Sequence, residues 1–166
     1  DDRSAGWEAV ADQFMTIRMP VGAALVRSWA RRHLAPSAAI LDIGCGSGVP
    51  IARGLVEDGF QVAGIDASPS LIAAFRRNFP DMTAACEPAQ DSAFFGRTFA
   101  GVVSIGVIFL LDEKDQRDLL RKIADALEPG GRLLFSAPRE KCKWPDSLTS
   151  RTSTSLGAEA YARDLD

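Results

Sequence analysis

Three glycines separated by single residues form the segment of this sequence with the clearest chemical meaning. Gly44, Gly46 and Gly48 follow an apolar run that ends in Ile43 and contains one acid, Asp42. Glycine lets the backbone turn sharply, and without a side chain it leaves main-chain atoms open to a ligand. The spacing therefore predicts a loop that holds a ligand against its backbone.

An acidic residue lies 18 positions beyond the last of these glycines. Asp66 ends a second short apolar run, and a carboxylate at the end of a strand can accept hydrogen bonds from both hydroxyls of a ribose. In an open parallel sheet, ligands bind in the crevice outside the carboxyl ends of the strands. The glycine loop and Asp66 are thus expected to face one crevice.

Short β-rich runs alternate with helical patterns around these residues. This alternation predicts an α/β fold with a doubly wound parallel sheet, because right-handed crossovers place helices on both faces. Ser68 and Asp112 are expected to cap two of the helices. The expected strands cover residues 38–43, 61–65, 82–86, 101–105 and 132–136, and the expected helices cover residues 7–17, 20–33, 50–58, 69–79, 113–127 and 157–165.

The ordered set of motifs resembles the class I S-adenosylmethionine-dependent methyltransferases. That family has a Gly-x-Gly-x-Gly loop after its first strand and an acid at the end of its second, and the resemblance covers residues 7–137, including Gly130 and Gly131. It implies a Rossmann-like, mostly parallel sheet and an enzyme with S-adenosylmethionine as cofactor and S-adenosylhomocysteine as product. It also implies in-line displacement of a methyl group from the sulfonium to a small-molecule acceptor.

The same resemblance implies roles for individual residues. Asp42 would fix the glycine loop or bind the amino group of the methionine moiety, and Asp66 would bind the ribose. Leu71 would pack near the adenine, and Glu87 would accept a hydrogen bond from the adenine amino group. The other cofactor-binding residues implied are Gly44, Cys45, Gly46, Gly48, Ala67, Pro88, Ala89, Ser104, Ile105 and Gly106.

Two positions depart from the family's pattern. Pro88 stands where the family often donates a backbone N–H to the adenine ring, and proline has no N–H to donate. Either Ala89 takes over this role or the adenine shifts. Ala100 stands where the family commonly has an acid, which weakens an electrostatic role at the start of the fourth strand.

Candidates for the acceptor side lie at both ends of the chain. Trp7, Phe14 and Arg18 lie on the leading helices, which in similar enzymes fold over the cofactor, and Trp144 follows the fifth strand. The alternatives are core packing for the two N-terminal aromatic side chains, a solvated charge for Arg18 and a surface turn for Trp144. No residue is identified as a catalytic base.

Composition excludes several classes of partner. The net charge is −3 with no basic stripe, so nucleic acid is disfavoured. The longest nearly apolar stretch, residues 101–111, is too short to span a bilayer. Three widely spaced cysteines indicate reduced thiols and a cytoplasmic setting, and a single histidine leaves no metal site predicted.

Two other functions compete with methyl transfer. A nicotinamide-dependent oxidoreductase would place its third glycine at position 49, where the chain has Val49, followed by Pro50. A regulatory or degenerate protein that binds S-adenosylmethionine without turnover would keep the same motifs. Binding of the cofactor alone does not separate this second class from an enzyme.

The 166 residues suit a single domain, which we divide into an N-terminal helical lid (1–36), a Rossmann-like core (37–137) and a C-terminal segment (138–166). Residues 147–155 contain seven serines and threonines and are predicted to form a loop. Because the family has seven strands, we expect the hairpin of strands 6 and 7 to be missing and the chain to be truncated. The exposed sheet edge would then favour a homodimer.

Overall fold

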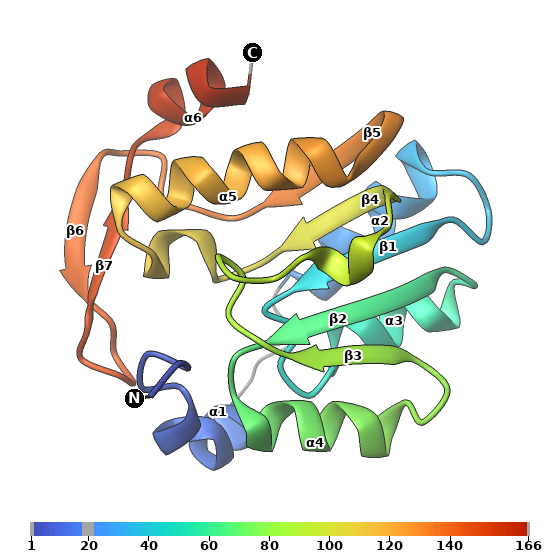
Figure 1. Ribbon diagram of the computed structural model, residues 1–166, viewed down its shortest axis with the longest axis horizontal. Coiled ribbons are helices and arrows are strands. Elements are labelled where there is room, and N and C mark those ends of the chain that lie inside the picture. Colours follow the sequence, from blue (N-terminus) through green and yellow to red (C-terminus); the bar gives the residue numbers. More distant parts are fainter. Residues whose placement is uncertain (1, 18–21, 166) are drawn as a thin grey trace.

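A five-stranded parallel sheet forms the centre of the protein (Figure 1). The computed structural model describes residues 2–17 and 22–165. The strands lie in the order β3-β2-β1-β4-β5, and all neighbours in this sheet are parallel, as predicted. Their bounds are β1 (Ala39–Ile43), β2 (Gln61–Asp66), β3 (Thr83–Cys86), β4 (Phe99–Ser104) and β5 (Leu127–Phe135).

Helices cover both faces of this sheet and bury two separate hydrophobic clusters. One face packs against α2 (Ala23–His33), α3 (Ile51–Glu57) and α4 (Pro69–Asn78). The other face packs against α5 (Glu113–Ala126) and α6 (Ala158–Leu165). Successive strand residues point to opposite faces, so Ile40 of β1 joins the first cluster and Leu41 joins the second.

Two helices begin at the caps that the sequence predicts. The Ser68 hydroxyl accepts a hydrogen bond from Leu71 N at 3.2 Å at the start of α4. Asp112 Oδ1 accepts from Asp115 N at 2.9 Å at the start of α5. Each cap satisfies one of the backbone N–H groups that a helix leaves without an internal partner.

The N-terminal segment, residues 2–17, runs along the carboxyl ends of the strands (Figure 1). It contains the short 3-10 helix η1 (Glu8–Val10) followed by α1 (Ala11–Ile17), within the predicted helix 7–17. The second predicted helix is observed from Ala23, and its proposed start at Pro20 lies outside the described residues.

The prediction that the C-terminal hairpin is missing is wrong. β6 (Cys142–Pro145) and β7 (Thr152–Ser155) pair as antiparallel strands in a separate two-stranded sheet. Serine and threonine are typical of loops because their hydroxyls bond to nearby backbone. In β7, however, exposed Thr152 is followed by buried Ser153, and Thr154 is more exposed than buried Ser155. This alternation is the period of a strand.

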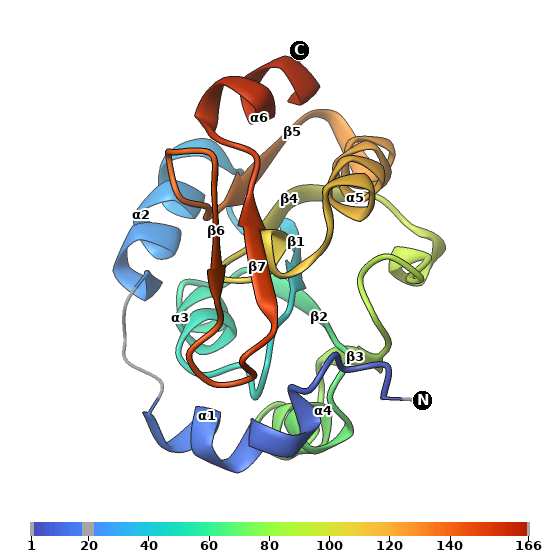
Figure 2. The same ribbon diagram turned by 90° about the vertical axis from the view of Figure 1, so that its left-hand side faces the viewer.

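The hairpin lies over the carboxyl ends of the strands, on the side where the N-terminal segment also runs (Figures 1 and 2). Trp144 of β6 packs against Phe109 of the 3-10 helix η3 (Ile108–Leu110), with ring centroids 5.3 Å apart. Because the hairpin forms its own sheet, β5 is still the last strand at one edge of the main sheet. Pairing of that edge with a second copy stays a prediction.

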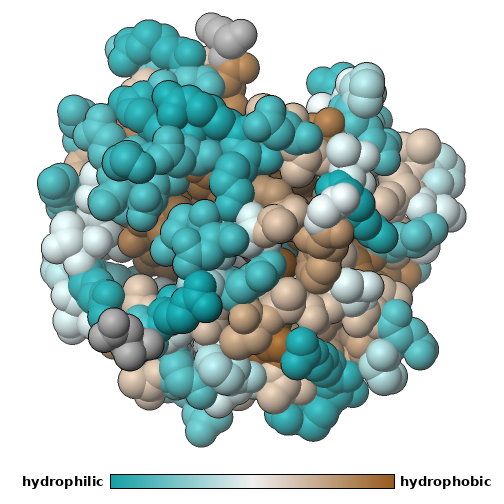
Figure 3. Space-filling model, in the orientation of Figure 1, coloured by the Kyte–Doolittle hydropathy of each residue, from teal (hydrophilic) through white to brown (hydrophobic). Residues whose placement is uncertain are grey.

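The exposed surface of the view in Figure 3 is hydrophilic over α5 and shows hydrophobic residues in the hollow below this helix. On α5, Lys114 and Arg121 both form ion pairs with Asp118.

No helix within residues 2–17 and 22–165 is both long and apolar enough to cross a membrane.

An ion-pair cluster connects α2 to the end of α3. Arg27 donates to both oxygens of Asp58, from Nε at 2.9 Å and from Nη2 at 2.6 Å, and Arg31 Nη1 lies 3.3 and 3.2 Å from the same two oxygens. Hydrogen bonding by Arg27 is the main cause that lowers the pKa of the Asp58 carboxyl, and the charges of both arginines act in the same direction.

We predict that Asp58→Asn lowers the free energy of unfolding by about 1 kcal/mol at pH 7, the range of a partly exposed pair. Because the pKa of Asp58 is lower in the folded protein, the pair stabilises fully above the usual value of 3.8 and loses this effect as pH falls through the lowered one. Urea unfolding at several pH values measures both effects. Equal stability of variant and wild type at pH 7 would contradict this account.

Candidate functional site

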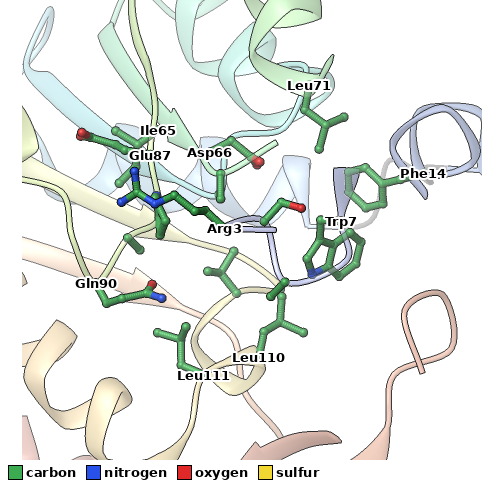
Figure 4. Close-up of a pocket in the computed structure, with 18 of the residues that line it drawn as sticks. Arg3, Trp7, Phe14, Ile65, Asp66, Leu71, Glu87, Gln90, Leu110 and Leu111 are labelled. Atoms are coloured by element: carbon green, nitrogen blue, oxygen red, sulfur yellow. The ribbon is translucent and has the colours of Figure 1, made fainter. Parts of the chain in front are cut away.

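A cavity of about 170 Å³ lies at the carboxyl ends of the strands, beneath the N-terminal segment (Figure 4). The cavity is partly open to solvent, so a ligand larger than its enclosed volume can extend beyond it. The residues that line it are Arg3, Ser4, Ala5, Trp7, Phe14, Gly44, Ile65, Asp66, Ala67, Leu71, Glu87, Pro88, Ala89, Gln90, Ile105, Gly106, Val107, Leu110 and Leu111.

The first glycine of the loop forms part of the cavity wall. Gly44 has a φ of 73°, and a Cβ atom at this position would lie 2.1 Å from Cγ2 of Val107. The amides of Gly44 and Cys45 both donate to the carbonyl of Ile65, at 2.8 and 3.0 Å. These hydrogen bonds hold the loop against the end of β2. Because Val107 is so close, any larger residue at position 44 would displace its side chain.

The last glycine of the loop serves packing. Gly48 has a φ of 80°, and a Cβ atom there would lie 2.4 Å from the ring of Phe79 and 2.9 Å from that of Phe75. Cys45 is buried, and its sulfur lies 2.7 Å from where a Cβ atom of Gly64 would stand. Five predicted cofactor residues are not among the described residues that line the cavity: Asp42, Cys45, Gly46, Gly48 and Ser104.

The Asp66 carboxylate connects two loops at the cavity. Its Oδ2 atom accepts a hydrogen bond from Gly46 N, and its Oδ1 atom accepts from Ser68 N, both at 2.9 Å. Through these bonds the carboxylate fixes the glycine loop after β1 relative to the loop after β2. Asp66 therefore shapes the site in addition to lining it.

The end of β3 supplies a second carboxylate to the wall. The amide of Glu87 donates to the Asp66 carbonyl at 2.9 Å, which continues the pairing of β3 with β2. The Glu87 side chain accepts from the Ser92 hydroxyl. The carbonyl of Pro88 accepts from Asp91 N and Ser92 N, so a tight turn follows directly and brings Pro88 and its neighbours Ala89 and Gln90 to the cavity.

The aromatic side chains predicted on the acceptor side divide between two places. Trp7 and Phe14 line the cavity and meet edge to face, with ring centroids 5.3 Å apart (Figure 4). Trp144 packs on Phe109 and is not among the described lining residues. Arg18 lies outside the described residues.

Eight lining residues were not predicted from the sequence. Val107, Leu110 and Leu111 follow β4, and their spacing of three and four residues is that of a helical turn, which was the available signal. Arg3 reaches the cavity from the N-terminus and pairs with Asp91 at 2.7 Å, and nothing in the local pattern indicates this contact. The other missed residues are Ser4, Ala5, Ile65 and Gln90.

A parallel sheet with a glycine loop after β1 and an acid at the end of β2 defines the Rossmann-like class of nucleotide-binding folds. Residues 40–131, more than half of the chain, match the family described as "Methyltransferase domain", and the chain belongs to this family. The resemblance expected from the glycine loop and Asp66 is confirmed at the level of the family.

Curated relatives share this region. The chain is 31% identical over 124 residues to the carboxy-S-adenosyl-L-methionine synthase of Chromohalobacter salexigens. The matched region covers 70% of this chain and 45% of that protein. It is 35% identical over 107 residues to the aklanonic acid methyltransferase DauC of Streptomyces sp. strain C5, covering 60% and 47% respectively. The chain thus spans about half the length of the curated relatives it matches.

A solved structure shares the fold over nearly the whole chain. It is the TehB-like SAM-dependent methyltransferase of Corynebacterium glutamicum, which superposes with a TM-score of 0.72 at 22% identity. The superposition covers 95% of this chain and 81% of that protein. At this identity the similarity demonstrates the fold.

Gly106 offers a test of the cavity as a ligand site. Its φ is 78°, a Cβ atom there would meet nothing within 4 Å, and Gly106 lines the cavity, so we expect the added methyl group to take up space at the cavity wall. We predict that Gly106→Ala costs about 1 kcal/mol of stability, the usual penalty of a left-handed alanine. It should also weaken binding of S-adenosylhomocysteine by about tenfold, the equivalent of 1.4 kcal/mol of steric conflict.

Gly59→Ala is the matched control, because Gly59 has a φ of 87°, equally open surroundings and a position in the turn after α3. Calorimetry and thermal unfolding should show a similar stability loss in both variants and an affinity loss only in Gly106→Ala. Equal affinities of the two variants would argue against a ligand at Gly106.

Proposed function

We propose that this chain binds S-adenosylmethionine in the cavity and transfers its methyl group to a small-molecule acceptor. The observation that carries the proposal is the Asp66 carboxylate, which lines the cavity while it holds the glycine loop and the loop after β2. Membership of the methyltransferase-domain family supports the reaction class. The description of the Corynebacterium glutamicum protein as SAM-dependent supports the cofactor.

The cavity wall offers chemistry that fits an adenosyl group. A carboxylate can accept about four hydrogen bonds, so accepting from two backbone N–H groups does not prevent Asp66 from binding ribose hydroxyls. Leu71 and Ala67 present apolar surface for the adenine, and Glu87 would accept from its amino group. Pro88 has no N–H to donate to the adenine ring, and we assign this contact to the backbone N–H of Ala89.

We assign the methionine moiety to the wall residues Gly44, Ile105 and Gly106, which line the cavity. Glycine at two of these positions leaves the backbone accessible to a ligand. We assign a supporting role to Asp42, Cys45, Gly46, Gly48 and Ser104, which shape the loop and the end of β4.

When bound, S-adenosylmethionine would supply an activated methyl group. The acceptor's lone pair would form the bond to this carbon, the carbon–sulfur electron pair would stay on the sulfur of S-adenosylhomocysteine, and an acceptor proton would pass to water. The protein's part is to align the reactants and exclude water, which can contribute about 7–11 kcal/mol in a well-oriented site. Trp7, Phe14, Leu110 and Leu111 provide apolar walls for this purpose. We assign no catalytic base.

A binding protein without turnover is the main alternative. Its cavity would bind the same cofactor, so the two functions differ only in transfer. Incubation with a labelled methyl donor and a broad set of small amines, alcohols and thiols separates them. Label in an acceptor supports the enzyme, and tight binding without transfer to any acceptor favours the alternative.

We predict that the protein binds S-adenosylmethionine and S-adenosylhomocysteine but not NAD. The physical reason is that Val49 and Pro50 replace the third glycine that a pyrophosphate-binding loop requires. Isothermal titration calorimetry with the three compounds measures this. Binding of NAD without binding of either sulfur compound would contradict the proposal.

Asp66→Asn should weaken binding of S-adenosylmethionine by at least about tenfold, since one charged acceptor of ribose hydroxyls and of two backbone donors becomes neutral. The domain should stay folded, because Asp66 is only partly buried at the cavity. Calorimetry measures the affinity, and circular dichroism checks the fold. Asp12→Asn, at an exposed position of α1, removes the same charge and should leave the affinity unchanged. Equal affinity of Asp66→Asn and wild type would sink the assignment.

A further inference from the structure

The side chain of Glu8 joins the N-terminal segment to the start of α4. Its Oε2 atom accepts from Ser70 N at 3.0 Å and from the Ser68 hydroxyl, and its Oε1 atom accepts from the Ser70 hydroxyl. Hydrogen bonding by Ser68, followed by that of Ser70, lowers the pKa of the Glu8 carboxyl. Three donors at one helix start thus bind a carboxylate from a segment sixty residues earlier in the chain.

Ser68 connects Glu8 to the cavity residue Asp66 by hydrogen bonds. Its hydroxyl has one proton, which it donates to Glu8, and it accepts from Leu71 N at 3.2 Å. Its backbone amide donates to Oδ1 of Asp66, whose Oδ2 atom accepts from Gly46 N, both at 2.9 Å. A continuous series of hydrogen bonds therefore runs from Glu8 through Ser68 and Asp66 to Gly46.

The N-terminal segment has a second anchor, but it is weaker. Arg3 pairs with Asp91 at 2.7 Å, and the two side chains are 63% and 56% exposed. Exposed pairs of this kind contribute little to stability. Glu8 is only partly exposed and has three donors, so it is the stronger of these two polar contacts of residues 2–17.

We propose that Glu8 is a positioning residue for cofactor binding: it couples closure of the N-terminal segment to the orientation of Asp66 and the glycine loop. This inference rests on the proposed function, because it takes the cavity to be the cofactor site. Coupling between two sites is reciprocal in free energy. A cofactor held by Asp66 would therefore stabilise the contact of Glu8 with the start of α4. Loss of the Glu8 contact would weaken cofactor binding by the same factor by which the cofactor strengthens that contact.

The first test needs no ligand. Hydrogen exchange of single amides, followed by NMR, should be faster at Ser68 and Gly46 in Glu8→Gln than in wild type, by about fivefold or more, the lower range of such couplings. The amide of Asp115, which donates to Asp112 Oδ1 at the start of α5, serves as an internal reference that should not change. Asp12→Asn removes the same charge from α1 and should match wild type. Unchanged exchange at both Ser68 and Gly46 overturns the proposal.

The second test uses S-adenosylhomocysteine. Glu8→Gln should bind it about fivefold or more weakly than wild type, and the same substitution should have little effect in an Asp66→Asn background if the coupling passes through Asp66. Equal losses in both backgrounds would mean that Glu8 acts only as part of the cover, and would overturn the proposal. Ser70→Ala, which removes one hydroxyl donor to Glu8, provides a second variant if Glu8→Gln does not fold.

The two tests separate this inference from the function. Failure of wild type to bind either sulfur compound would contradict the proposed function whatever the exchange rates show. Binding by wild type with unchanged exchange and affinity in Glu8→Gln would contradict only the positioning role.

Discussion

The site depends on one carboxylate that holds two loops at a fixed distance. Asp66 ends β2 and accepts from Gly46 in the loop after β1 and from Ser68 at the start of α4. Both loops lie at the carboxyl ends of neighbouring parallel strands, where the topology alone brings them together but does not fix their relative position. The carboxylate supplies that position, and Asp66 is also one of the residues that line the cavity.

The glycine loop divides its work between the ligand side and the core side. Gly44 lies so close to Val107 that no side chain fits between them, and a Cβ atom at Gly48 would also collide with the rings of Phe75 and Phe79. The loop is therefore packed between Val107, which precedes η3, and the rings of Phe75 and Phe79 at the end of α4. A regular spacing in the sequence corresponds here to two separate steric requirements, with the backbone of the middle glycine bound to Asp66.

Local sequence signals predicted the central sheet and its helices well, and they predicted the hairpin and the N-terminal segment poorly. Ser68 and Asp112 cap their helices because an N-cap depends on a few adjacent residues. The strand β7 escaped prediction because its serines are buried by contacts with distant parts of the chain, such as the bond from the Ser155 hydroxyl to the Pro138 carbonyl. Arg3 and Glu8 escaped as functional candidates for the same reason: their partners Asp91 and Ser68 are remote in sequence.

The central claim is that Asp66 binds the ribose of an adenosyl ligand while it holds the two loops. The most direct measurement is a crystal structure of the protein with S-adenosylhomocysteine. The account predicts both ribose hydroxyls within about 2.5–3.0 Å of the Asp66 carboxylate oxygens, with Gly46 N and Ser68 N still donating to the same group. A ligand bound away from the carboxyl ends of β1 and β2, or an Asp66 side chain turned out of the cavity, would contradict it.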